Sequence, residues 1–175
     1  MKKLLLISTC VILAFAACKK DSNKATTSSL SLSATVSGTN ETFSNVTAQS
    51  IVDTPGYTIG ISGSRGSGAN LEVLQLEVNS ANPVTTGTYT LNSTTSSNIN
   101  TFPLLAYYKY TSATNELIYG TDLTGTNVST ITISSISSTN VQGTFSGVLI
   151  DQMDGTTTDA ITNGKFNATI TKAKQ

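Results

Sequence analysis

The feature that most constrains this sequence is an alternation of apolar and hydroxyl side chains with a period of two. Leu30, Leu32, Ala34 and Val36 alternate with Ser or Thr, which places all four on one face of a strand. Segments of this kind recur between Gly, Asn, Ser or Pro residues. We predict about ten strands, near residues 30–36, 43–52, 57–62, 73–78, 87–91, 104–110, 117–119, 128–136, 141–150 and 165–171.

The composition favours a β protein with a hydroxyl-rich surface. Ser and Thr make up roughly 30% of the 175 residues, well above average usage, whereas charged residues make up 11%. No segment carries a convincing helical pattern, and short connections favour antiparallel hairpins. About 150 residues remain after the targeting segment, enough for one core. We therefore predict a single all-β domain over residues 30–175, either an antiparallel β-sandwich or a partly closed barrel.

The first residues have the pattern of a bacterial export signal. Lys2 and Lys3 precede a mostly apolar run that is too short to span a bilayer. The run ends in small residues directly before Cys18, which resembles the lipobox of bacterial lipoproteins, although Phe15 stands where that motif more often has Leu. The resemblance implies that residues 1–17 are a lipoprotein signal peptide. It also implies that Cys18 carries a diacylglyceryl group and an amide-linked acyl chain such as palmitate. The alternative is an ordinary signal peptide cleaved nearby.

Residues 18–29 form a polar stretch without apolar periodicity, which we interpret as the lipidated cysteine and a flexible tether. Lys19 follows Cys18, whereas an Asp there would resemble an inner-membrane retention signal. We therefore expect an outer-membrane protein that contacts the membrane through the anchor at Cys18. The Cys-Lys-Lys-Asp start also resembles the surface-export signals of Bacteroidota lipoproteins. A solvated linker near anionic headgroups is the alternative.

Four short motifs resemble a group of small Bacteroidota lipoproteins. They are Gly-Thr-Phe-Ser-Gly at 143–147, Thr-Asn-Gly-Lys-Phe at 162–166, Gly-Thr-Tyr at 87–89 and Ala-Thr-Val-Ser-Gly at 34–38. The resemblance implies a β-rich extracytoplasmic domain with no assigned activity. The alternating glycines at 143–147 would let a bulky ring or a facing backbone come close.

Several classes of function are disfavoured by composition. The chain contains no His, so it cannot build a Ser-His-Asp triad, a Cys-His dyad or an imidazole metal site. Cys10 would leave with the signal peptide and Cys18 would be acylated, which excludes thiol redox chemistry. From residue 26 onward nine acidic side chains face five basic ones. We therefore expect no nucleic-acid partner.

Two clusters are candidate sites. Asp151, Asp154 and Asp159 fall in one predicted hairpin loop and could hold Ca²⁺ through oxygen ligands, although the spacing is not that of an EF-hand. Asp-x-x-Asp-Gly is also favourable turn chemistry.

Tyr107, Tyr108 and Tyr110 form an aromatic cluster that could bind a glycan or a protein. Alternation sends Tyr108 and Tyr110 to one face and Tyr107 to the other, so one set is expected in the core, and cross-strand aromatic packing is the alternative.

The sequence predicts no catalytic residue. Glu72 and Glu77 lie on opposite faces of a strand, so they cannot form the carboxylate pair of a glycosidase. Arg65 lies among glycines at a predicted hairpin tip, without a phosphate-binding context.

We predict a non-catalytic surface binding module. The alternatives are a periplasm-facing structural or accessory component of an envelope complex and a carboxylate-dependent hydrolase.

Overall fold

The computed structural model describes residues 30–53, 56–92, 101–112 and 115–172. Cys18 and the segments proposed as signal peptide and tether lie outside the described residues. Within the described part, the all-β prediction with about ten strands is confirmed. The elements are β1 (Ser31–Val36), β2 (Thr39–Asp53), β3 (Gly56–Arg65), the 3-10 helix η1 (Gly68–Asn70), β4 (Glu72–Ser80), β5 (Gly87–Leu91), β6 (Thr101–Ser112), β7 (Asn115–Thr121), β8 (Ser129–Ile136), β9 (Asn140–Asp151) and β10 (Thr158–Lys172).

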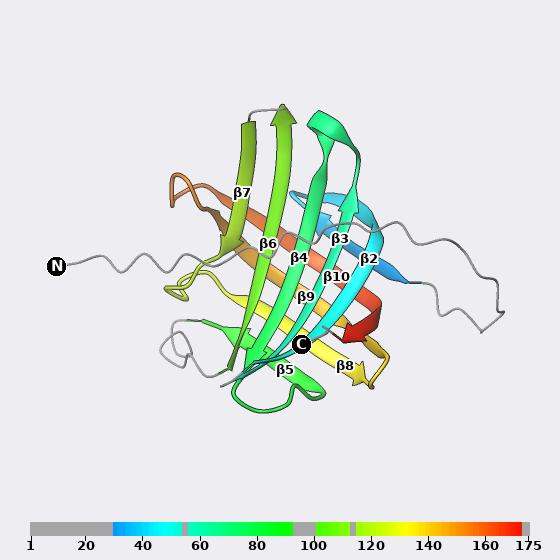
Figure 1. Cartoon of the computed structure of the whole chain (residues 1–175). Coiled ribbons are helices and arrows are strands. Elements are labelled where there is room, and N and C mark those ends of the chain that lie inside the picture. Colours follow the sequence, from blue (N-terminus) through cyan, green and yellow to red (C-terminus); the bar gives the residue numbers. More distant parts are fainter. Residues whose placement is uncertain (1–29, 54–55, 93–100, 113–114, 173–175) are drawn as a thin grey trace, which may run out of the picture.

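Eight of these strands close into a barrel. The ring is β1-β2-β3-β4-β6-β7-β9-β10, and β8 and β5 continue from β9 as two additional strands. Neighbouring strands pair antiparallel, except for a short parallel contact between β10 and β2. In Figure 1, β2, β3, β4, β6 and β7 form the front wall, while β10, β9, β8 and β5 cross obliquely behind them. Of the two predicted architectures, the observed strand order is therefore that of the barrel.

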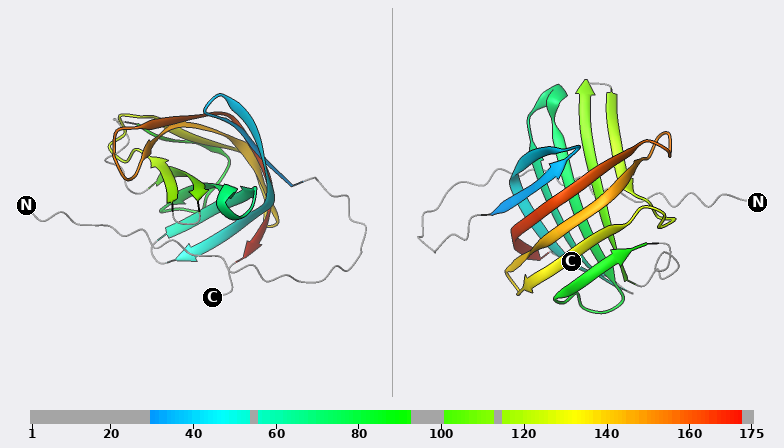
Figure 2. Two further views of the ribbon diagram at one scale, coloured as in Figure 1. Left: turned by 90° about the horizontal axis from the view of Figure 1, so that it is seen from above. Right: turned by 180° about the vertical axis from the view of Figure 1, so that it is seen from behind.

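One edge of β9 serves two partners. Residues 149–151 pair with β7, and residues 141–147 pair with β8, while the other edge of β9 pairs with β10. Beyond the end of β7, the same edge of β9 therefore pairs with β8, and β5 pairs with β8 in turn. Figure 2, viewed from above, shows the front and rear walls enclosing the interior.

Local backbone geometry explains where the strands begin. Ser37 and Gly38 have φ of 48° and 80°, the pair of positive values that a tight hairpin turn requires. The chain therefore turns at Ser37 and Gly38, and Thr39 already belongs to β2. In β10 a register shift between Ile161 and Gly164, with Asn163 at φ 53°, lets the strand begin at Thr158 instead of near residue 165.

The core fills the middle of the barrel with inward-facing apolar side chains from every wall. The alternation predicted for residues 30–36 is confirmed for Leu32, Ala34 and Val36, which are buried, whereas Leu30 precedes β1 and is exposed. Gly143 faces the ring of Phe166, whose Cζ would lie 2.6 Å from a Cβ at this position. Phe166 in turn packs on Phe145, with ring centroids 6.4 Å apart. Gly143 therefore admits a bulky ring, as the sequence predicted, whereas Gly147 faces Ser129.

The two ends of the barrel differ. We call the end at the β3-η1-β4 connection, uppermost in Figure 1, the η1 end. We call the opposite end the mouth; it is bounded by the ends of β2, β8 and β10, the start of β3 and the β4–β5 connection.

Candidate functional site

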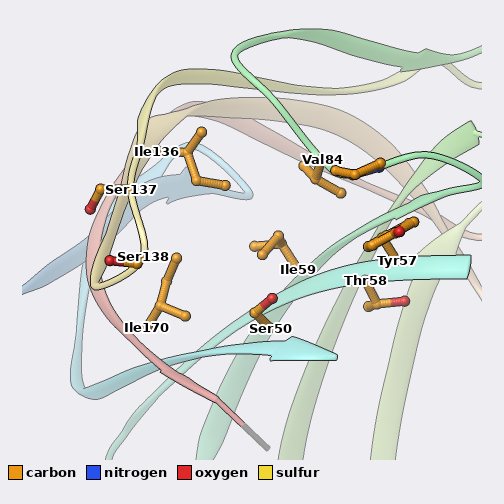
Figure 3. Close-up of a pocket in the computed structure, with 10 residues that line it drawn as sticks. Ser50, Tyr57, Thr58, Ile59, Val84, Ile136, Ser137, Ser138 and Ile170 are labelled. Carbon is orange, nitrogen blue, oxygen red and sulfur yellow. The ribbon is translucent and has the colours of Figure 1, made fainter. Parts of the chain in front are cut away.

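The mouth holds a pocket of about 280 Å³. Its walls come from elements far apart in sequence that meet at this end of the barrel (Figure 3). The lining residues are Ser50, Tyr57, Thr58, Ile59, Pro83, Val84, Ile136, Ser137, Ser138 and Ile170. Barrel mouths are common ligand sites, and this volume lies just below the range for drug-sized molecules.

Strand register positions the front wall of the pocket. Ser50 pairs with Ile59 across β2 and β3, and Tyr57 pairs with Ser80 across β3 and β4. Ser50, Tyr57 and Ile59 have inward parity with the buried Ala48 and Ile61, so the pocket is the continuation of the core toward solvent.

The rear wall depends on the parallel contact between β10 and β2. Ile170 lies opposite Ala48 in that contact, and its amide donates a 2.9 Å hydrogen bond to the carbonyl of Thr139. The β8–β9 turn is thereby held against the end of β10. Ile136, Ile170 and Val84 face a common space with Ile59 (Figure 3).

The hydroxyl groups of the pocket fall into two classes. Thr58 Oγ1 donates to Asn79 Oδ1 at 2.8 Å, and Ser137 Oγ accepts from the amide of Asn140 at 3.1 Å within its own turn. The hydroxyls of Ser50, Tyr57 and Ser138, by contrast, have no hydrogen-bond partner in the described part of the chain. A ligand could therefore use these three groups without breaking a bond within the described part of the protein.

Near the η1 end lies an ionic cluster around the buried side chain of Glu72. Glu72, 7% exposed, faces inward at the start of β4 and accepts hydrogen bonds at Oε2 from Arg65 Nε and Tyr107 Oη, both at 2.6 Å. Arg65 also pairs with Glu41, and Lys109 Nζ lies 3.9 Å from Glu72 Oε1.

The cluster fixes the protonation states of its members. Burial alone would raise the pKa of Glu72, but the hydrogen bonds from Arg65 and Tyr107 outweigh it and hold that pKa below its ordinary value. Burial, followed by the hydrogen bond to Glu72, raises the pKa of Tyr107. The hydrogen bond to Glu72 raises the pKa of Arg65. The cluster is thus an internally satisfied ion pair with a neutral phenol beside it.

The predicted tyrosine cluster is divided by the wall of the barrel. Tyr107 is 3% exposed and belongs to the core and the ionic cluster. Tyr108 and Tyr110 have the opposite parity on β6 and lie on the outer face, as the alternation predicted. The hydrogen bond to Glu116 raises the pKa of Tyr110. The three rings therefore do not form one binding platform.

The predicted acidic loop does not bring its carboxylates together as ligands. Asp151 Oδ1 accepts from the amide of Met153 at 2.7 Å, and Asp154 Oδ1 from the amide of Thr156 at 2.7 Å. Asp159 Oδ1 accepts from Ser37 Oγ at 2.6 Å. No group of three acidic or cysteine side chains suited to a metal ion occurs among the described residues. Asp151 and Asp154 thus act in local turn chemistry, whereas Asp159 lies on β10 and accepts from the turn between β1 and β2.

Sequence reasoning missed both the pocket and the ionic cluster. The pocket carries no motif, because it is made of common Ser and Ile residues from both ends of the chain. Arg65 was assigned to a hairpin tip, whereas it turns inward to Glu72. The signal that could have found this pair is Glu72 itself, whose parity matches the apolar Leu74 and Leu76.

Within the described part of the chain, no helix has the length and hydropathy needed to cross a membrane. No protein-family model, curated protein or solved structure matches this chain.

Proposed function

We propose that this protein is a lipid-anchored, non-catalytic binding protein whose ligand occupies the mouth of the barrel. The observation that carries the proposal is the pocket itself, a mostly apolar hollow at the mouth of the barrel whose lining includes hydroxyl groups without a partner in the described residues. Eight-stranded barrels have interiors of a size that side chains fill or that one small ligand can occupy.

The chemistry of the pocket favours binding over catalysis. Its ten lining residues include hydroxyl groups but no carboxylate, amine or thiol that could act as a general base or nucleophile. The buried carboxylate of Glu72 is held ionised by Arg65 near the other end of the barrel. This arrangement supports a binding module over the carboxylate-dependent hydrolase.

The anchor is the second part of the proposal. A lipidated Cys18 would tether the barrel through residues 18–29 to an outer membrane, on the cell surface, as the resemblance to Bacteroidota lipoproteins implies. Several acyl chains, at about 0.8 kcal/mol per buried methylene, would make this attachment stable. Mass spectrometry of the protein from its native membrane tests it: acylated Cys18 is expected, and an unmodified N-terminus at another residue would contradict it.

The binding proposal is tested by isoleucine-methyl NMR with a library of small molecules. The protein is the chain from residue 18 with Cys18→Ser, which retains all ten strands but carries no lipid to compete for the pocket. Bound compounds are expected to shift the methyl signals of Ile59, Ile136 and Ile170 while those of the core residue Ile131 stay in place. A library that leaves all three pocket isoleucines unchanged would contradict the proposal.

A matched pair of variants locates the site. Ser50→Phe places a ring in the pocket and is expected to abolish the methyl shifts, whereas Thr47→Phe places the same ring on the exposed face of β2 and is expected to preserve them. Unchanged circular dichroism shows that each variant retains the fold. If the folded Ser50→Phe variant shows the same methyl shifts as the parent protein, the ligand binds outside this pocket.

A further inference from the structure

The pocket combines an apolar inner part with a polar rim. Ile59 and Ile170 are 4% and 8% exposed, so the side of the pocket next to the core is hydrocarbon. Ser50 and Tyr57, which have inward parity on β2 and β3, carry two of the three lining hydroxyl groups that have no partner in the described residues. A molecule that satisfies both parts needs an apolar body and a hydrogen-bonding head.

The pocket lining has no charged side chain, and this restricts the charge of the ligand. None of the ten residues carries an ionised side chain at neutral pH. Transferring an ionised carboxylate or ammonium group into such a site without a counter-ion costs far more than transferring a hydroxyl group that finds a hydrogen bond. The Ser50 and Tyr57 hydroxyls can both donate and accept, so they match a neutral alcohol or ester group.

Volume limits the size of the ligand. A pocket of about 280 Å³ has room for roughly nine groups of the size of a water molecule, at about 30 Å³ each. A medium-length chain or a single substituted ring fits this space, whereas a long acyl chain would extend into solvent.

We propose that the mouth selects a neutral amphiphile of medium length, with its hydrocarbon against Ile59, Ile136 and Ile170 and its hydroxyl or ester group bonded to Ser50 and Tyr57. This inference rests on the proposed function, because it names the ligand class of that same pocket. It makes the polar rim the determinant of specificity and the isoleucines the source of affinity.

The experiment compares three probes of equal chain length: 1-octanol, octanoate and octylammonium at neutral pH. The Cys18→Ser chain is titrated with each below its aggregation concentration, and the methyl signals of Ile59, Ile136 and Ile170 give the affinity. Octanol is expected to bind at least about tenfold more tightly than either ion, since one uncompensated charge outweighs a hydrogen bond. Equal or tighter binding of octanoate or octylammonium would overturn the inference.

A chain-length series tests the size limit. From butanol upward, each methylene is expected to tighten binding about fourfold while it is buried, and the gain is expected to stop near octanol. A gain that continues unchanged to dodecanol would contradict the volume argument.

Two variants test the polar rim. Ser50→Ala and Tyr57→Phe are each expected to weaken octanol binding about threefold to tenfold by removing one hydrogen-bonding group. Thr47→Val is the control, since Thr47 lies on the exposed face of β2 outside the pocket, and it is expected to leave the affinity unchanged. Unchanged affinity in both rim variants would overturn the assigned orientation.

The outcomes separate this inference from the proposed function. If the pocket isoleucines respond to library compounds but to no alcohol, the ligand class is wrong while the binding function stands. If they respond to no compound at all, both are wrong.

Discussion

Tyr107 donates a 2.6 Å hydrogen bond to the carboxylate of Glu72 across 35 residues of sequence. Both side chains are nearly fully buried, and the same carboxylate oxygen accepts from Arg65. A polar group of this kind stabilises the fold only while its partners are present, because an unpaired buried charge is costly. The contribution of each partner of Glu72 to the stability of the fold can therefore be measured by removing that partner alone.

Removal of the phenol is the first test. Tyr107→Phe keeps the ring but deletes one donor to Glu72, and it is expected to destabilise the protein by about 1–3 kcal/mol, the range for a hydrogen bond to a charged group. Urea unfolding measures the change. Tyr110→Phe is the control, because its hydroxyl bonds Glu116 on the outer face, and a loss as large as that of Tyr107→Phe would contradict the assignment.

Acid should weaken the cluster through Glu72. Its folded pKa lies below its unfolded value of about 4.3, so its stabilisation is complete above that pH and is lost as the pH falls through the folded pKa. We expect Glu72→Gln to be less stable than the parent at pH 7 and the difference to narrow below about pH 4. Urea unfolding at several pH values measures it, and a difference independent of pH would contradict the ionised state of Glu72.

The glycine at position 143 provides a packing test. A Cβ there would press on the Phe166 ring and on the backbone oxygen of Thr132, so Gly143→Ala is expected to cost about 3 kcal/mol or to prevent folding. Gly60→Ala is the matched control, since nothing lies within 4 Å of its added Cβ, and a change within about 0.5 kcal/mol is expected. Similar losses in both variants would mean that backbone freedom, not the ring contact, matters at residue 143.

The exposed carboxyl of Asp154 should titrate unusually low. The Thr157 hydroxyl, together with the amides of Thr156 and Thr157, lowers the pKa of Asp154 to about 2. Stabilisation by this group is therefore present above the unfolded pKa of about 3.9 and is lost as the pH falls toward 2. Carbon-detected NMR titration measures the midpoint. Thr157→Val, which removes the largest cause, is expected to raise it, and an unchanged midpoint would contradict this explanation.

Calcium gives a separate test of the acidic loop. Asp151, Asp154 and Asp159 each accept hydrogen bonds from different donors, so millimolar Ca²⁺ and a chelator are expected to give the same Tm. A ligand that binds the folded state must raise its stability. A rise in Tm with Ca²⁺ that Asp154→Asn removes would restore the calcium hypothesis.

The period-two pattern was enough to predict the strands and the face of most side chains. It assigned Tyr107 and Tyr108 to opposite faces and separated Glu72 from Glu77, and the burial of these residues agrees. Alternation along one strand, however, contains no information about which strands become neighbours. The pairing of Arg65 with Glu72 and Glu41 depends on the order of three strands.

The pocket was unpredictable for the same reason. Ile170 meets Ala48 through a parallel contact between the last strand and the second one, in a sequence whose short connections predict antiparallel hairpins. Ser50 and Tyr57 look like any other surface hydroxyls until the register places them at the mouth. A site made of common residues can be recognised only when the strand order and the register are known.

The pairing of β10 has a consequence for how this chain matures. β10 contacts β9, β1 and β2, so the last strand to be synthesised joins both ends of the ladder. Until it arrives, β1, β2 and β9 keep unpaired edges that are open to aggregation. The barrel therefore cannot close until β10 has been added. Loss of the last fifteen residues of the strand ladder would therefore leave an open sheet in place of a slightly smaller barrel.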